Sequence, residues 1–237
     1  IKVAELIKFL NNSFHALKVA FGNEVGRISH ALNLGDNKLI ELFLKDKILN
    51  ISEIYYKPGF SYGGSCLPKD LMALNSIASN LNINLPLLNN VEQSNTMHTK
   101  FILERILKFN IKNVGIYGLA FKKGTDDLRF SKSLDICEQL LGKGKNIYVY
   151  DRYVNISKII GSNKDFLDNK IPHINKMLVS DFDNFTKKSN LIVLIHKPSE
   201  ELIKKLLVFL KHSDNCILDL SLNIKFKKYN NYYGCNW

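Results

Sequence analysis

The chain has 237 residues, 46% of them hydrophobic, and a formal net charge of +11. This length and apolar content can form one large domain or two ordinary ones. There is no run of about 18 apolar residues and no signal-peptide pattern, which argues against a membrane span and predicts a cytoplasmic protein. Because the lysines are spread along the chain, the charge indicates a general preference for anions, and a nucleic-acid-binding module is only a rival interpretation.

The N-terminal part of the chain predicts one long amphipathic helix. The sequence opens with IKVAELIKFL, without an initiator Met or an N-cap residue, so we expect it to start partway through a longer protein. The helix should run over about residues 3–32, with an apolar side formed by Leu6, Leu10, Leu17, Phe21 and Ile28. A polar stripe opposite this side contains Lys8, Asn12, His15 and Asn23. The stripe is either a solvated surface or a row of donors facing a polar ligand.

Three further helices are predicted before the pattern changes, over about residues 36–48, 68–81 and 86–109. Pro68 and Pro86 suit the first turns of the last two. The loop ahead of Pro68 contains Gly59, Gly63 and Gly64, which allow close backbone approach. Residues 1–109 are therefore expected to form an all-helical domain.

A single cysteine, Cys66, follows the glycine pair in this loop. The four cysteines of the chain are widely separated and form no CxxC pair, so we predict no metal site and no dense disulfide framework. Cys66 precedes a predicted helix N-terminus and lies close to Lys69, and both features favour a reactive thiolate. The alternative is a structural cysteine, because free cysteines are commonly buried.

Short apolar runs replace the helical pattern in the second half. Four runs, in NVGIY, NIYVYD, NLIVLI and NCILDL, are predicted strands, and helices are predicted in SLDICEQLLGKG and over residues 199–210. Strands alternating with helices indicate an open, mainly parallel Rossmann-like sheet, which we assign to a second domain over residues 110–237. The loop GLAFKKGTDDLR follows the first strand, where such sheets commonly bind ligands, and Lys122, Lys123 and Arg129 could pair there with phosphates. A solvent-exposed loop is the alternative.

Three stretches, AELIKFLNNSFHALKVAFGNEVGRI, PGFSYGGSCLPKD and GLAFKKGTDDLR, together resemble the UDP-glucose/GDP-mannose dehydrogenase family in residues, order and spacing. The GDP-mannose branch is the most similar, because LLGKGKNIYVYDR, GSNKDFLDNKIPH and the terminal GCNW also follow its pattern. The resemblance implies a central helical dimerisation domain followed by a Rossmann-like domain that helps to hold the sugar nucleotide. The family's N-terminal NAD-binding domain, with its glycine-rich fingerprint and an active-site glutamate, has no counterpart in these residues.

The resemblance also implies roles for individual residues. Cys66 would be the catalytic nucleophile, Lys8 and Asn12 would stabilise a negatively charged oxygen, and Asp70 would orient or deprotonate water. The residues expected to contact the sugar nucleotide are His15, Asn23, Tyr55, Lys57, Phe60, Gly63 and Lys122. Lys69 and Arg129 would approach NAD.

The implied reaction is an NAD-dependent four-electron oxidation of a nucleotide-sugar C6 alcohol to the uronic acid, through a thiohemiacetal and a thioester on Cys66. GDP-mannose, giving GDP-mannuronate, is the expected substrate. UDP-glucose is the alternative, because Ile54 and Lys57 stand where the GDP-mannose branch has a tyrosine and an arginine, and lysine lacks the bidentate fork. A non-catalytic sugar-nucleotide-binding or dimerisation remnant without the NAD domain is a further alternative. The resemblance also implies a homodimer through the central helices.

Overall fold

The computed structural model describes residues 2–31, 34, 38–47, 58–80, 85–154, 174–221 and 226–235. The chain forms two compact units, residues 1–100 with 236–237, and residues 101–235. The boundary between them falls inside helix α4 (Pro86–Lys108), because the last turns of α4 bury Ile102, Leu103 and Ile106 in the second unit. The boundary at 109/110 marks instead the change from helices to strands along the chain, and as a domain boundary it stays a prediction.

The first unit is built from helices. They are α1 (Lys2–Ala31), α2 (Lys38–Phe43), α3 (Cys66–Asn80) and the first part of α4. Helix α1 packs on α3, and a core cluster contains Ala16, Ala20, Tyr62, Leu71 and Val91. The two alanines let the helices approach closely. Helix α2 ends earlier than predicted, because residues 44–47 form turns, and none of the described helices is long and apolar enough to cross a membrane.

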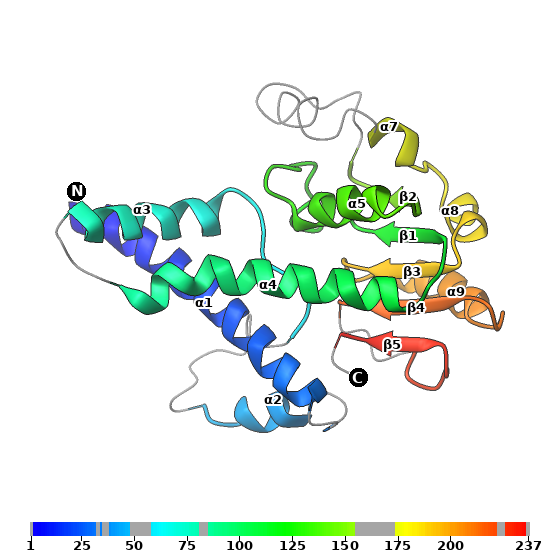
Figure 1. Cartoon of the computed structure of the whole chain (residues 1–237), viewed down its shortest axis with the longest axis horizontal. Helices are drawn as coiled ribbons and strands as arrows, with labels where there is room; N and C mark the ends of the chain where they lie inside the picture. The colour runs from blue at the N-terminus through cyan, green and yellow to red at the C-terminus, as the bar shows by residue number, and fades with distance from the viewer. Residues whose placement is uncertain are drawn as a thin grey trace. The chain divides into compact units, whose positions relative to one another are not determined.

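The second unit contains a parallel sheet with the strand order β2-β1-β3-β4-β5. The strands are β1 (Asn113–Tyr117), β2 (Asn146–Tyr150), β3 (Leu191–Leu194), β4 (Cys216–Asp219) and β5 (Tyr232–Gly234). Figure 1 shows α5 (Lys132–Gly142) on the opposite side of the sheet from α9 (Glu200–Phe209). The predicted order of helices followed by a parallel α/β sheet is confirmed.

The core of the second unit explains why these segments form strands. All four residues of β3 are buried, as expected for a central parallel strand covered on both faces. On one face, a cluster of Tyr117, Ile192, Leu194 and Ile217 packs with apolar residues of α8 (Phe182–Lys188) and α9. Helix α5 ends in a Schellman motif, in which Gly144 has φ +71° and the Lys145 amide donates to the Leu140 carbonyl over 3.0 Å.

Three short elements were not predicted from the sequence: α7 (Ile174–Met177), α8 and β5. Helix α8 carries a recognisable signal, since Asp181 is its N-cap and accepts a hydrogen bond from the Asn184 amide. Strand β5 has only three residues in a polar tail. It forms because β4 offers an unpaired edge and because the Tyr232 hydroxyl donates to the buried Asp219 carboxylate.

Candidate active site

Helices α1 and α3 bring three of the predicted catalytic side chains together. Lys8 and Asn12 are one turn apart on α1. The Nδ2 of Asn12 donates a hydrogen bond to Oδ2 of Asp70, and the Nζ of Lys8 lies 3.8 Å from the same oxygen. The Asp70 side chain is 1% exposed, whereas that of Lys8 is 64% exposed. The two α1 side chains thus hold a buried carboxylate, while the Lys8 ammonium stays accessible to a ligand.

Cys66 lies on the same helix as this carboxylate. It is the first residue of α3, it is exposed, and its thiol forms no disulfide. Cys66 and Asp70 are four residues apart, so they lie on the same side of α3. Gly64, with φ +83°, turns the chain into the helix in a conformation that a side chain would strain. The exposed thiol is therefore presented at the positive end of a helix, one turn from a buried carboxylate.

Four other predicted residues of the first unit lie on α1 or in the loop before Cys66. The Oδ1 of Asn23 accepts a hydrogen bond from the Gly59 amide over 3.1 Å, and Asn23 is almost fully buried. Its Nδ2 has no hydrogen-bond partner within the part of the chain that the structure describes. His15, Phe60 and Gly63 are half-buried. Asn23 therefore combines a structural role with an amide donor that the described residues leave unused.

We did not predict the polar side chains of α4 that contact this loop. Asn95 and His98 are fully buried and Thr99 nearly so, and all three hydrogen-bond to residues 59–62. A signal is present in the sequence. Asn95 and His98 share one helix face with the buried Val91 and Ile102, and polar residues on an apolar face need partners.

In the second unit, the predicted ligand loop starts from a tightly bonded turn after β1. The Oδ2 of Asp151 accepts hydrogen bonds from the amides of Leu119 and Ala120, over 2.8 and 3.2 Å. The Nε2 of His196 donates to the Ala120 carbonyl over 2.9 Å, and its Nδ1 is 3.8 Å from Asp151. Burial lowers the pKa of His196, although the Asp151 carboxylate acts in the opposite direction. The start of the loop is thus fixed at the carboxyl ends of the strands.

The basic residues of this loop differ in their exposure and in their ion pairs. Lys122 is exposed. The Arg129 guanidinium forms a two-point ion pair with Asp127, over 3.0 and 2.8 Å, which lowers the pKa of that carboxyl. Lys69, the other residue expected near NAD, is exposed on α3 in the first unit. Tyr55, Lys57 and the departure at Ile54 lie outside the described residues.

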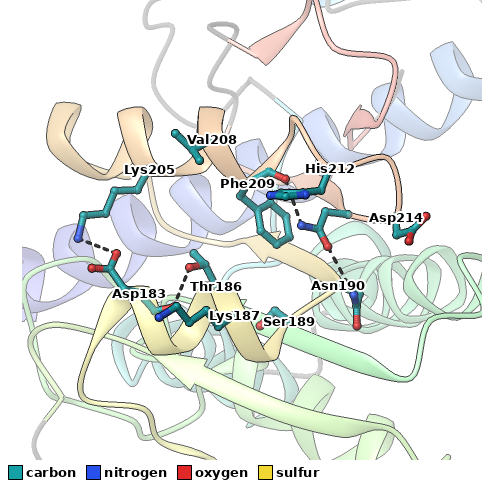
Figure 2. A pocket seen from close by; sticks show the side chains of 11 residues that line it. Asp183, Thr186, Lys187, Ser189, Asn190, Lys205, Val208, Phe209, His212 and Asp214 are labelled. Atoms are coloured by element: carbon teal, nitrogen blue, oxygen red, sulfur yellow. Dashed lines mark hydrogen bonds and ion pairs between the residues drawn. The ribbon is translucent and has the colours of Figure 1, made fainter.

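Among the described residues of the second unit, hollows lie at opposite edges of the sheet. One, of about 710 Å³, lies between α8 and α9 near the amino ends of β3 and β4, and Figure 2 shows the Lys205 to Asp183 ion pair at its rim. The other, of about 360 Å³, lies at the carboxyl ends of β1 and β2 and contains Lys123 and Arg152. Open α/β sheets bind ligands at the carboxyl edge. The smaller hollow is therefore the better placed for a phosphate-bearing ligand.

Comparison with protein-family models gives two matches. Residues 2–97 match the central domain of the UDP-glucose/GDP-mannose dehydrogenase family. Residues 115–217 match the UDP binding domain of the same family. The two matches follow one another along the chain in the order expected from the sequence.

Comparison with individual proteins gives the same assignment. GDP-mannose 6-dehydrogenase of Pseudomonas savastanoi pv. phaseolicola is 42% identical over 194 residues, which cover 82% of this chain and 44% of that protein. UDP-glucose 6-dehydrogenase of Rickettsia bellii is 37% identical over 153 residues, covering 62% of this chain and 35% of that protein. The chain thus spans less than half the length of the curated relatives it matches.

Solved structures extend the likeness to the whole chain. A ternary complex of GDP-mannose dehydrogenase from Pseudomonas aeruginosa matches 100% of this chain and 54% of its own, with 36% identity and a TM-score of 0.69. A UDP-glucose dehydrogenase from Pyrobaculum islandicum matches with a TM-score of 0.77 and 24% identity, over 99% of this chain and 51% of its own. The second match supports the fold alone.

Proposed function

Because the chain belongs to the UDP-glucose/GDP-mannose dehydrogenase family, we propose that it serves the oxidation of a nucleotide sugar at C6, with Cys66 as the nucleophile. The observation that carries this proposal is the arrangement around Cys66. An exposed thiol begins α3, and a buried carboxylate one turn later is held by two side chains of α1. The four side chains supply a nucleophile and two donors, which suit covalent capture of an aldehyde, and a carboxylate, which suits the later hydrolysis of the thioester.

The covalent step uses only residues of this chain. The Sγ of Cys66 attacks C6 of the sugar aldehyde, a carbon–sulfur bond forms, and the electron pair of the C=O π bond moves to oxygen, which then takes up a proton. The Lys8 ammonium and the Asn12 amide lie on the α1 side of Asp70, where they can stabilise the charge developing on that oxygen. Capture as a thiohemiacetal keeps the aldehyde from leaving between the two oxidations.

Asp70 is proposed to act in the hydrolysis of the thioester. Water adds to the thioester carbon, the carbon–sulfur bond breaks, and the products are the uronic acid and the free thiol. The Asp70 carboxylate lies on the same side of α3 as Cys66, from which it can orient the water or accept its proton. Its contacts with Asn12 and Lys8 keep this buried group in place.

NAD, when bound, supplies the acceptor for the hydride removed in each of the two oxidations. The exposed Lys69 and the fixed guanidinium of Arg129 are the residues of this chain that would hold it, since cationic donors suit its diphosphate. Asp127 orients that guanidinium in advance.

GDP-mannose is the proposed substrate, supported by the higher identity and coverage of the Pseudomonas relatives. The side chains proposed to bind it are His15, Asn23, Tyr55, Lys57, Phe60, Gly63 and Lys122. UDP-glucose is the second candidate, supported by the Rickettsia relatives and by the departures at Ile54 and Lys57. Calorimetric titration of the chain with each nucleotide sugar ranks the two, and tighter binding of UDP-glucose would reverse our order.

We also propose a homodimer through the central helices. Five large apolar side chains of α1 are 39% to 50% exposed: Leu6, Ile7, Leu10, Phe14 and Phe21. At 100° per residue they fall within an arc of about 100°, so they form one continuous stripe. This stripe includes much of the apolar side recognised in the sequence, and it is not the face that packs on α3. A second copy of this chain would bury it.

The nucleophile is tested without any hydride transfer. The 237-residue chain is mixed with the C6 aldehyde of GDP-mannose labelled with ¹³C at C6, and the label is followed by NMR. We expect a new C6 resonance of a carbon bonded to sulfur and oxygen, and we expect Cys66→Ser and Cys66→Ala to lose it.

The control is Cys216→Ala, which removes a half-buried thiol of the second unit and should leave the resonance intact. Cys137 is no competitor, because burial raises its pKa to about 12. Persistence of the resonance in Cys66→Ala, or its absence from the unsubstituted chain, would refute the assignment. Nucleotide-sugar binding without an adduct would favour the non-catalytic remnant.

A further inference from the structure

We propose that Asn95 and His98 of α4 are positioning residues for Cys66. They hold the backbone of residues 59–62, and through Gly63 and Gly64 this segment sets where the thiol meets the substrate. The inference rests on the proposed function, because it concerns the reaction of Cys66. It adds a third helix to a site whose reacting groups lie on α1 and α3.

Asn95 holds Tyr62 as a neighbouring β-strand would. Its Oδ1 accepts a hydrogen bond from the Tyr62 amide over 3.0 Å, and its Nδ2 donates to the Tyr62 carbonyl over 2.9 Å. One side chain thus satisfies both polar groups of a buried residue, and Asn95 is itself 0% exposed. Loss of the Asn95 amide would leave a buried donor and a buried acceptor without partners.

His98 and Thr99 hold the residues before Tyr62. The Nε2 of His98 must carry a proton, because its partner at 2.8 Å is the Gly59 carbonyl, which can only accept. The Thr99 hydroxyl donates to the Ser61 hydroxyl over 2.8 Å, and Ser61 donates to the Asn95 carbonyl over 3.3 Å. The loop is therefore hydrogen-bonded to three residues on one face of α4, Asn95, His98 and Thr99.

The ring of Tyr62 adds a fourth anchor. It packs in the cluster with Ala16, Ala20 and Leu71, and its hydroxyl donates to Glu92 over 2.8 Å. Burial and the Glu92 charge raise the pKa of Tyr62, so the hydroxyl keeps its proton. Both the backbone and the side chain of Tyr62 are thus held.

Only Gly63, Gly64 and Ser65 separate this anchored residue from Cys66. Two glycines in sequence would leave a free loop with wide backbone freedom. Fixing Tyr62 at one end and α3 at the other confines them to one path, in which Gly64 takes its left-handed φ of +83°. Small displacements of a reacting group can lower reactivity by about 100-fold, so anchoring at Tyr62 matters for the adduct.

The test compares Asn95→Leu with Asn75→Leu. Asn95→Leu keeps the approximate volume and removes both bonds to Tyr62. Asn75 is a matched control, since its Nδ2 joins α3 to the Leu88 carbonyl of α4 over 3.3 Å without a bond to residues 59–62. For each variant we measure the ¹³C adduct with the GDP-mannose aldehyde, alkylation by iodoacetamide, and the urea midpoint.

We expect Asn95→Leu to lower the adduct equilibrium constant by about tenfold or more, because the thiol no longer meets the bound carbonyl in a fixed geometry. Alkylation by iodoacetamide, which needs no bound substrate, should change less than about threefold. Asn75→Leu should lower the urea midpoint and leave the adduct unchanged. His98→Phe should weaken the adduct, and His98→Gln, whose amide can donate to Gly59, should restore much of it.

Each outcome decides between the two proposals. A normal adduct in Asn95→Leu, or an equal loss in Asn75→Leu, overturns the positioning role and leaves Cys66 as the nucleophile. If Asn95→Leu does not fold, the His98 pair decides, and equal adducts in His98→Phe and His98→Gln overturn the role. Absence of any adduct in the unsubstituted chain overturns both proposals.

Discussion

At the scale of single residues, the unusual feature of the site is a buried carboxylate with one charged neighbour in solvent. Asp70 is stabilised by the hydrogen bond from Asn12 more than by Lys8, because an ion pair of 3.8 Å with an exposed ammonium is screened by water. The bond from the half-buried Asn12 amide to the buried carboxylate is less exposed to water and is screened less. The two contacts to this oxygen should therefore contribute differently to the free energy of unfolding.

This difference is measurable by urea unfolding. Asp70→Ala leaves the Asn12 amide without its acceptor and should lower the free energy of unfolding by about 1 to 3 kcal/mol. Lys8→Met removes only the exposed partner and should cost less than about 1 kcal/mol. Equal losses in the two variants would contradict this ranking. Lys8→Met should also reduce the adduct of the GDP-mannose aldehyde, because the proposed capture step uses the Lys8 ammonium, whereas Asp70 is proposed to act in the later hydrolysis.

At the scale of secondary-structure elements, the turn after β1 uses its backbone amides within the fold itself. In dinucleotide-binding folds, the turn after the first strand cradles a pyrophosphate on backbone amides. Here the Asp151 carboxylate already accepts hydrogen bonds from the amides of Leu119 and Ala120. A carboxylate of the chain thus takes the place of the dinucleotide's phosphate at this turn. In the proposed function, the phosphate groups of the substrate would then bind through side chains farther along the loop, such as Lys122.

The same turn depends on Gly118, which has φ +99°. A Cβ at this position would lie 2.5 Å from Cγ of His196, so Gly118→Ala combines backbone strain with a clash. We expect it to lower the free energy of unfolding by about 1 to 3 kcal/mol, or more if His196 is displaced.

Gly142, the last residue of α5, is the control for Gly118. Nothing lies within 4 Å of a Cβ built there, and its φ is not positive. Gly142→Ala should be neutral or should stabilise the protein by up to about 1 kcal/mol. Similar unfolding curves for the two alanine variants would contradict the proposed strain and clash at Gly118.

At the scale of the whole molecule, the exposed apolar stripe of α1 predicts self-association. In sedimentation equilibrium at tens of micromolar, the chain should be a dimer, which requires an association free energy of roughly −6 kcal/mol or stronger. The double variant Leu10→Glu with Phe14→Glu places two charges in the stripe and should give a monomer. Val208→Glu changes an exposed apolar residue of α9 and should stay dimeric. A monomeric unsubstituted chain would contradict the proposed dimer.

Much of the architecture could be read from local patterns. Apolar residues at helical spacing, and prolines in first turns, placed α1, α3 and α4 to within a few residues of their observed ends. Apolar runs bounded by polar loops placed β1 to β4. These signals are local because helix and strand periodicity act between near neighbours. The short elements α8 and β5 were not predicted, because a segment of three to seven residues shows little periodicity.

The candidate site also has one part that the sequence indicated and one part that only the tertiary structure showed. Motif resemblance alone indicated Cys66, Lys8, Asn12 and Asp70 as one set, but only folding brings the Asn12 amide to a carboxylate 58 residues away. No sequence motif predicted the hydrogen bonds by which Asn95, His98 and Asp151 hold the neighbouring loops. Their roles arise because a buried polar group must find a partner, and that partner comes from whichever segment packs beside it. Local pattern therefore determined most of the elements and motif resemblance supplied the candidate reactive residues, whereas packing between distant segments decided which polar side chains hold them in place.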